Sequence, residues 1–426
     1  MRGACEVRRC ILPALLVLPL LAVACRGQGR AGDEERLRAS IDDLLPRIEA
    51  LSGLEARAPV RMAMRDRAEL REYVAARMEE ELPPAELEGI EGAYRALGLL
   101  PDTLDLHALM LDLLTEQVLG YYDPETETLY LVSGVPRDAL EPVLAHELVH
   151  ALQDQHVDLD SLVARERGND RQTAAQAAIE GHATLVMVAL LAEQQARRPV
   201  SPDMLPDLKQ ELGPALEAEN EQFPVFRSAP RILRETLLFP YLEGAAFVQA
   251  LWRADAAGGR PAPLGPLLPQ STEQVMRPRE RFIETRDEPT ELTLGAADGG
   301  GEGDWRLVYE NTLGALETGI LLSEHLGAGA ERAAQGWDGD RYRLLEAPGG
   351  GRALVWYSVW DDAGAADAFA AAYRRVLEVR AAERHGRVER LEVEGRPVVR
   401  VVDAERAVEL DAVPVPELVG LSERGG

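Results

Sequence analysis

Apolar residues recur every three or four positions in three N-terminal segments, which predicts helices over residues 37–48, 70–78 and 104–119. Between the first two, apolar and polar residues alternate over residues 60–65, as in a short strand. The region from residue 37 to residue 104 is therefore predicted to be mostly helical.

The pattern changes in the next segment. Residues 121–132 predict a β-hairpin with an Asp-Pro turn between its strands. Helical spacing then returns and predicts helices over about residues 140–156, 173–195 and 237–252. Residues 105–285 are expected to form one mostly helical domain with a small edge β-sheet.

A segment rich in glycine precedes the C-terminal part of the chain. Residues 286–304 are the predicted linker, because their last ten positions are Gly, Ala, Asp and Glu. Residues 305–426 are predicted to form a separate α+β domain, so the expected fold class of the whole chain is α+β. The elements predicted in that domain are helices over 313–326 and 365–379 and strands over 353–359 and 398–402.

The N-terminus has the pattern of an export signal. Three arginines within the first nine residues precede an uncharged stretch, residues 11–23, that is too short to span a bilayer comfortably. The stretch leads into Leu-Ala-Val-Ala-Cys, which resembles the lipobox of bacterial lipoproteins and makes Cys25 the lipidated residue. Residues 1–24 are then the predicted signal peptide, and residues 25–36 are a polar tether.

The cysteine count favours a thiol at Cys25 that is used for lipidation and not for a disulfide. The three cysteines are Cys5, Cys10 and Cys25, so none follows the cleavage point and no disulfide partner remains. The alternative is a secreted protein cleaved after Ala24, with an incidental cysteine. In a host with two membranes, the absence of aspartate after the cysteine resembles lipoproteins of the outer membrane. The expected location is therefore the bacterial cell envelope, on a membrane.

Length and charge narrow the function classes. A chain of 426 residues exceeds one ordinary core, so two or three domains are expected. The formal net charge of −27 argues against nucleic-acid binding, because phosphate backbones are held by basic surfaces. No later segment approaches ~20 uninterrupted apolar residues, so no membrane-spanning helix is expected after processing. These patterns specify no oligomeric state.

The motif that carries chemistry is His-Glu-Leu-Val-His at residues 146–150, inside a predicted helix. Residues four apart lie only ~40° apart around a helix, so His146 and His150 share one face and can bind one Zn²⁺ ion. Glu147 lies ~100° from His146, where it can reach a water on the metal as a general base. Catalytic zinc takes three protein ligands and one open position, so a third ligand is expected elsewhere.

Glu180 is the favoured third ligand. It is an acidic residue in an otherwise apolar, Ala-rich helix, and a buried carboxylate is costly unless it is paired or bound to a metal. Gly181 and Ala183 are small and are expected to let this helix approach the helix with the two histidines. The alternative is an ordinary glutamate on a helix surface.

His156 is the competing third ligand. It lies six residues after His150, the separation that metzincins use, but Gln153 stands where metzincins have a glycine. If the helix continues through this stretch, His156 points ~240° away from His150 and does not reach the same metal.

The His-Glu-x-x-His helix followed by Glu-Gly-x-Ala resembles the gluzincin zinc metallopeptidases and a group of uncharacterised bacterial and archaeal surface lipoproteins. Residues 239–244 and 271–278, and more loosely 336–340, extend this resemblance, which covers about residues 105–285. It implies a zincin-like fold and peptidase chemistry. The group usually carries histidine at the position of Arg277, so any role of an imidazole there is in doubt in this chain.

Two further positions are weaker candidates. Asp154, one turn after His150, is a candidate to orient an imidazole from behind, and Tyr241 is a candidate oxyanion donor. For both, an ordinary structural role is the alternative. His182 is assigned to packing or to the surface, and Trp337, Trp356 and Trp360 are assigned to the C-terminal core.

The expected function is a membrane-anchored zinc metallopeptidase that hydrolyses peptide or protein substrates with a zinc-activated water and Glu147 as general base. The strand over 129–132 is expected to pair with an extended substrate. The alternatives are a non-catalytic envelope lipoprotein with a structural or vestigial zinc, and a binding or assembly factor that acts mainly through residues 305–426.

Overall fold

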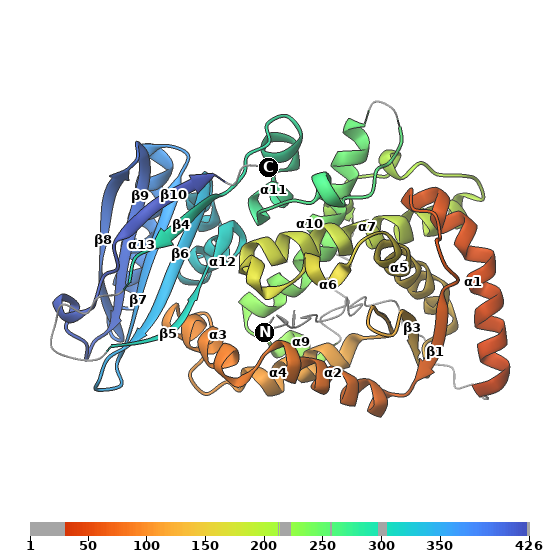
Figure 1. The fold of residues 1–426 in the computed structure, drawn as a ribbon, viewed down its shortest axis with the longest axis horizontal. Helices are drawn as coiled ribbons and strands as arrows, with labels where there is room; N and C mark the ends of the chain where they lie inside the picture. Colours follow the sequence, from red (N-terminus) through yellow and green to blue (C-terminus); the bar gives the residue numbers. More distant parts are fainter. Residues whose placement is uncertain (1–29, 212, 214–222, 256–257, 297–304, 424–426) are drawn as a thin grey trace, which may run out of the picture.

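The computed structural model describes residues 30–423 except 212, 214–222, 256–257 and 297–304. Cys25, the expected signal peptide and residues 297–304 of the expected linker lie outside these residues. Figure 1 shows two parts side by side, a helical part with a three-stranded sheet and a larger sheet accompanied by two helices. The chain is therefore of the mixed α+β class, as predicted.

All six helices predicted before residue 286 are present. The described helices of this part are α1 (Arg30–Ser52), α2 (Arg67–Glu81), α3 (Pro84–Ala96), α4 (Leu106–Gln117), α5 (Arg137–His156), α6 (Leu159–Leu162), η1 (Arg165–Arg167), α7 (Asn169–Ala196), η2 (Pro202–Met204), α9 (Pro224–Ser228), α10 (Arg231–Ala254), η3 (Gly265–Leu267), α11 (Thr272–Met276) and η4 (Arg279–Ile283). Helix α3 was missed because its buried residues are glycines and alanines, which give a weak apolar signal.

The small sheet consists of β1 (Arg61–Arg65), β2 (Gly120–Asp123) and β3 (Thr128–Val132), in the order β1-β3-β2. Strands β2 and β3 form the predicted antiparallel hairpin, while β1 joins β3 in parallel, with Arg61 opposite Thr128. The expectation that β3 pairs with an extended substrate is wrong, because both of its edges are already hydrogen-bonded to neighbouring strands.

Three helices cross at the centre of the helical part, where α7 packs against α5 on one side and α10 on another. A Cβ atom on Gly181 of α7 would lie 2.0 Å from the carbonyl carbon of Gly244 in α10, and one on Gly244 would lie 2.0 Å from the Ala177 oxygen. Gly181 therefore serves the approach of α7 to α10, and the expectation that it serves the approach to α5 is wrong.

The C-terminal sheet has the order β5-β6-β7-β9-β8, and all of its neighbouring strands are antiparallel. Residues 290–294, which were expected in the linker, instead form strand β4, so the predicted linker is too long. Strand β4 pairs with β10 in a separate ribbon that packs on the sheet through Leu292 and Leu294. The elements of this part are β4 (Thr290–Leu294), β5 (Arg306–Asn311), α12 (Gly314–Leu326), η5 (Ala330–Ala334), β6 (Trp337–Glu346), β7 (Arg352–Trp360), α13 (Ala363–Val379), β8 (Arg384–Val393), β9 (Arg396–Glu405), η6 (Leu410–Ala412) and β10 (Leu418–Glu423).

The core under α12 and α13 is built around buried aromatic residues. Trp337, Trp356 and Trp360 are buried there, as predicted. Residues of α3, α4 and α9 belong to the same core, so helices of the helical part pack against the C-terminal sheet.

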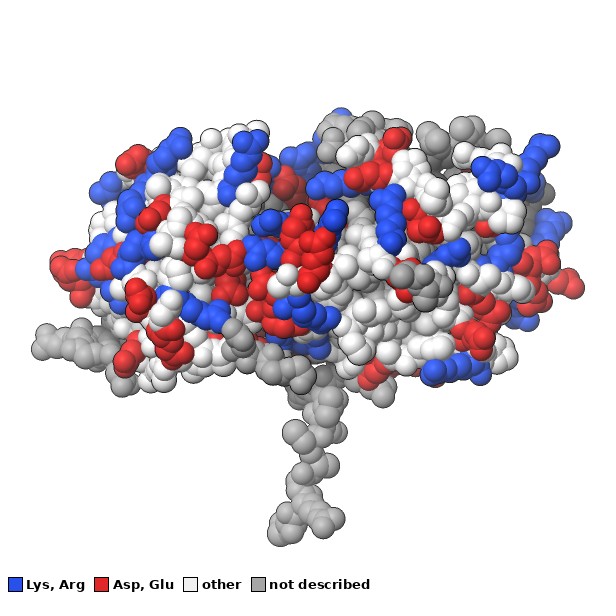
Figure 2. Space-filling model, turned by 90° about the horizontal axis from the view of Figure 1, so that it is seen from above, with Lys and Arg blue, Asp and Glu red and all other residues white. Residues whose placement is uncertain are grey.

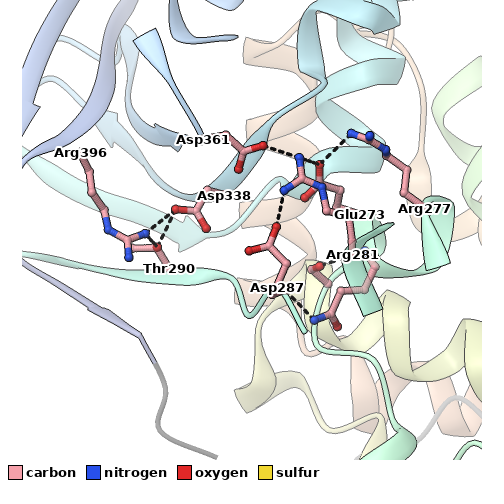
Figure 3. A network of polar contacts seen from close by, with 10 residues as sticks. Glu273, Arg277, Arg281, Asp287, Thr290, Asp338, Asp361 and Arg396 are labelled. Atoms are coloured by element: carbon pink, nitrogen blue, oxygen red, sulfur yellow. Dashed lines mark hydrogen bonds and ion pairs between the residues drawn. The ribbon is translucent and has the colours of Figure 1, made fainter. Parts of the chain in front are cut away.

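Ion pairs join the two parts at their junction (Figure 3). Arg281 of η4 bonds to Asp287 and reaches across to Asp361 at the end of β7. Arg277, one turn earlier, lies 3.9 Å from Glu273. On the face shown in Figure 2, acidic and basic side chains are intermingled over both parts, including the middle of the molecule.

Within the described residues, α7 alone has the length and hydropathy of a membrane-spanning helix, and 83% of its most apolar window is buried inside the protein. This helix carries Glu180 in its middle, at the crossing with α5 and α10.

Candidate metal centre

Helix α5 runs without interruption from Arg137 to His156 and places the motif in its second half. His146, Glu147 and His150 are completely buried. The Nε2 atoms of His146 and His150 lie 3.0 Å apart, because side chains one turn apart on a helix project in the same direction.

Helix α7 brings Glu180 to the same place. Its Oε2 atom lies 3.1 Å from His146 Nε2 and 3.5 Å from His150 Nε2, and it is also completely buried. The structure thus gathers the three residues that the sequence singled out as metal ligands, with one ligand atom from each within 4.8 Å of the others.

The donor set fits a zinc ion. Tetrahedral zinc with bonds of about 2.0–2.2 Å holds neighbouring ligand atoms roughly 3.3 Å apart. The three separations of 3.0, 3.1 and 3.5 Å lie close to that value. Two imidazoles and one carboxylate are also the ligands that catalytic zinc takes in several hydrolases.

Several polar atoms around this cluster have no hydrogen-bond partner among the described residues. They are both carboxylate oxygens of Glu147, Oε1 of Glu180 and Nδ1 of His146. Buried polar atoms are nearly always satisfied, so orphan atoms gathered at one place indicate a site for a ligand. Since three of the four are carboxylate oxygens, that ligand is expected to carry positive charge or protons.

The electrostatics of the cluster favour a positive charge at its centre. Burial alone would lower the pKa of His150, but the charge of Glu180 and a hydrogen bond to it raise that pKa to about 9. Burial alone would raise the pKa of Glu180, but the charge of His150 and hydrogen bonds to both imidazoles lower it to about 2. Burial lowers the pKa of His146 to about 4.

Glu147 lies in a different environment from Glu180. Burial raises its pKa to about 8, in spite of the lowering effects of His150 and of a backbone contact with Tyr122. A cation held by the neighbouring residues would lower this pKa and give the deprotonated carboxylate that a general base requires.

Of the two weaker candidates, Tyr241 lies near the cluster and Asp154 does not contact it. The ring of Tyr241, from α10, lies 6.3 Å from the ring of His146, so this residue is near the cluster. The Asp154 carboxylate instead accepts a hydrogen bond of 2.9 Å from the Tyr122 hydroxyl in β2. The expectation that Asp154 orients an imidazole is therefore wrong. Asp154 instead connects α5 to the small sheet through this hydrogen bond.

His156 and Arg277 lie away from the cluster. The Nε2 atom of His156 lies 2.8 Å from the backbone oxygen of Glu55, because α5 continues through Gln153 and turns His156 to another face. The metzincin-like arrangement therefore does not form. Arg277 belongs to the junction network of Figure 3.

Two buried residues next to the cluster were not recognised as part of it from the sequence. The Nδ1 atom of His150 lies 2.8 Å from Oε1 of Gln153, and Gln153 Nε2 lies 3.1 Å from Nδ1 of His182. The sequence pattern marks Gln153 only as the residue in place of the metzincin glycine, and it predicts a packing or surface role for His182. A polar residue one turn after His150 in a buried helix was the signal that could have found the first of these contacts.

A cleft of about 590 Å³ lies at the start of α7, between the two parts of the molecule. It is lined by Gly168 just before α7, by residues 170–171 of α7, by strand β4 and by parts of β5 and β6. No residue of the metal cluster lines it. The cleft and the metal cluster are therefore separate features of the protein.

Comparison with known proteins leaves the metal cluster outside any family match. A family described as a domain of unknown function (DUF8575) matches residues 305–417, which contain the five-stranded sheet with α12 and α13. No curated protein matches the chain. Among solved structures, the chain is similar to a protein from Chloroflexus aurantiacus described as a "putative hydrolase with a novel fold". The two share 20% sequence identity with a TM-score of 0.35, over 60% of this chain and 90% of that chain.

Proposed function

We propose that this protein is a zinc-dependent metallopeptidase of the gluzincin type with a zincin-like fold around α5, α7 and the small sheet. The observation that supports it is the convergence of His146, His150 and Glu180 beside the completely buried carboxylate of Glu147. A carboxylate next to a three-ligand zinc site is the arrangement that zinc hydrolases use for proton transfer.

Each residue then has a distinct task. His146, His150 and Glu180 hold the zinc ion, which when bound polarises a peptide carbonyl and makes water acidic. Glu147 accepts the proton of the attacking water and delivers it to the leaving amine, for which its free oxygens are suited. Tyr241, beside His146, is the candidate donor to the oxygen that becomes negative.

The number of ligands distinguishes this proposal from a structural zinc site in a non-catalytic binding or assembly factor. A structural site is closed by four protein ligands, whereas the ligand group found in the described residues has three. At a closed site Glu147 would have no role. A buried carboxylate is costly for the fold, so its presence favours a site in which it takes part in the chemistry.

We further propose that Cys25 anchors the protein to a membrane of the bacterial envelope, the outer one where the host has two. This part of the proposal rests on the lipobox-like sequence alone.

The decisive experiment compares Glu147→Gln with the wild-type full-length protein, purified in detergent and loaded with zinc. Glu147→Gln should keep one zinc per chain and lose hydrolysis of a labelled casein substrate by at least ~100-fold, because only the proton acceptor is removed. Glu141→Gln is the matched control, since Glu141 lies on the same helix but bonds to Gln194.

Three results would overturn parts of the proposal. Loss of zinc in Glu147→Gln would mean that Glu147 is a ligand. Equal activity of Glu147→Gln and wild type would exclude Glu147 as the base. Absence of hydrolysis by the zinc-loaded wild type, over a panel of unfolded proteins, would favour the non-catalytic alternative.

A further inference from the structure

The orientation of the buried Gln153 amide is fixed by a group outside the metal cluster. Its Nε2 atom lies 3.0 Å from the backbone oxygen of Ile179 in α7. A carbonyl oxygen only accepts hydrogen bonds, so the amide nitrogen must face it and the amide oxygen must face the other way. That oxygen lies 2.8 Å from Nδ1 of His150, which must therefore carry a hydrogen.

A second backbone carbonyl fixes the next ring in the same way. The Nε2 atom of His182 lies 3.0 Å from the oxygen of Ser52, so this nitrogen donates. Its Nδ1 atom is then the acceptor for the second N–H of Gln153, at 3.1 Å. Ser52 is the last residue of α1, where carbonyl groups have no partner within the helix, so His182 also satisfies a helix end.

The chain of contacts therefore determines which nitrogen of His150 can bind a metal. With Nδ1 protonated by its bond to Gln153, Nε2 is the atom left with a lone pair in the neutral ring. Nε2 is also the atom that faces His146 and Glu180. His146 has no such arrangement, because its Nδ1 atom has no hydrogen-bond partner among the described residues.

We propose that Gln153 and His182 are positioning residues that hold His150 in the tautomer and orientation required for zinc binding, and that they couple the end of α1 to the metal centre. The inference rests on the proposed function only in that the cluster binds zinc. Partners behind a metal-bound histidine typically contribute 10–100-fold to metal affinity. Both side chains are completely buried, so their hydrogen bonds are made inside the protein and not with solvent.

The test measures zinc affinity by competition with a chromogenic chelator, using the full-length protein in detergent. Gln153→Met, which removes the amide at similar volume, should weaken zinc binding about 10–100-fold. His182→Phe keeps a ring against Trp252, which it meets edge-on at a centroid distance of 5.7 Å. This variant should weaken binding by a smaller factor, because the amide of Gln153 keeps its bond to Ile179.

Two further variants separate positioning from packing. Gln153→Glu restores an acceptor for the Nδ1 hydrogen of His150 and should bind zinc at least ~10-fold more tightly than Gln153→Met. Gln155→Met is the matched control, because Gln155 lies on the same helix but bonds to the backbone at residues 57–58. Its zinc affinity should equal that of the wild type.

The possible results distinguish the inference from the function on which it rests. If the wild type binds zinc and Gln153→Met binds it with the same affinity, the positioning role is overturned and the metal site stands. Equal weakening in Gln153→Met and Gln153→Glu would show a packing effect and also overturns it. Absence of stoichiometric zinc in the wild type overturns the metal site itself, and the inference with it.

Discussion

The third ligand decides which class of zinc site this chain builds, and replacing Glu180 tests it directly. In the structure, Oε2 of Glu180 lies 3.1 and 3.5 Å from the Nε2 atoms of the two histidines of α5. Nε2 of His156 is bonded to the Glu55 backbone oxygen instead. Glu180→Ala should therefore weaken zinc binding strongly, and His156→Ala should leave it nearly unchanged.

The size of the effect follows from the number of ligands. A structural zinc site with four ligands gains about 10–16 kcal/mol from the metal, so one ligand accounts for roughly 2.5–4 kcal/mol. Because each 1.4 kcal/mol changes a dissociation constant tenfold, Glu180→Ala should raise the Kd for zinc by about 10²–10³-fold. The loss of one hydrogen bond in His156→Ala should cost only about 1 kcal/mol of folding stability.

The assay is competition for zinc against a chelator of known affinity, together with the zinc content after dialysis. Glu180→Gln serves as a second variant, because it keeps the side-chain volume in a completely buried position and removes only the charge. A Kd for zinc within tenfold of wild type in both Glu180 variants, with an empty site in His156→Ala, would refute the reasoning. The metal would then be held in the metzincin-like way.

Two other predictions concern the C-terminal part and the membrane. Burial raises the pKa of Glu317 to about 7 from its ordinary 4.5, so its contribution to stability is full below pH 4.5 and is lost as the pH rises through 7. Glu317→Gln, which cannot ionise, should be more stable than wild type at pH 8 by about 2–3 kcal/mol in urea unfolding, and an unchanged pH profile would contradict this. Cys25→Ser should release the protein from the membrane fraction of cells, whereas unchanged membrane association would exclude the anchor.

The parts of the structure that could be predicted from the sequence are those set by local spacing. The helices with large apolar residues have a clear period, and two histidines four residues apart on a helix must face the same way. Glu180 was found because a carboxylate in the middle of an apolar helix needs a compensating group. Its position beside the histidines depends on the crossing of α5 and α7, which spacing within either helix does not specify.

Contacts between distant segments account for the errors. Strand β1 pairs with β3, although the paired residues Arg61 and Thr128 are far apart in the sequence. The hairpin pattern alone therefore predicted wrongly that one edge of β3 is free for a substrate. Asp154 was expected at an imidazole because it lies one turn from His150. The residue that takes this place, Gln153, lies three positions from His150, and its partners are Ile179 and His182 on another helix.

The packing of α7 also explains why the third ligand and its neighbour occur as a Glu-Gly pair. Gly181 lies so close to the backbone of Gly244 that any side chain at either glycine would push α7 and α10 apart. Such a shift would move Glu180, because it is the residue next to Gly181 on a rigid helix. It would also disturb Tyr241, which is carried by the same turn of α10 as Gly244. The two glycines therefore fix the spacing between α7, which carries Glu180, and α10, which carries Tyr241.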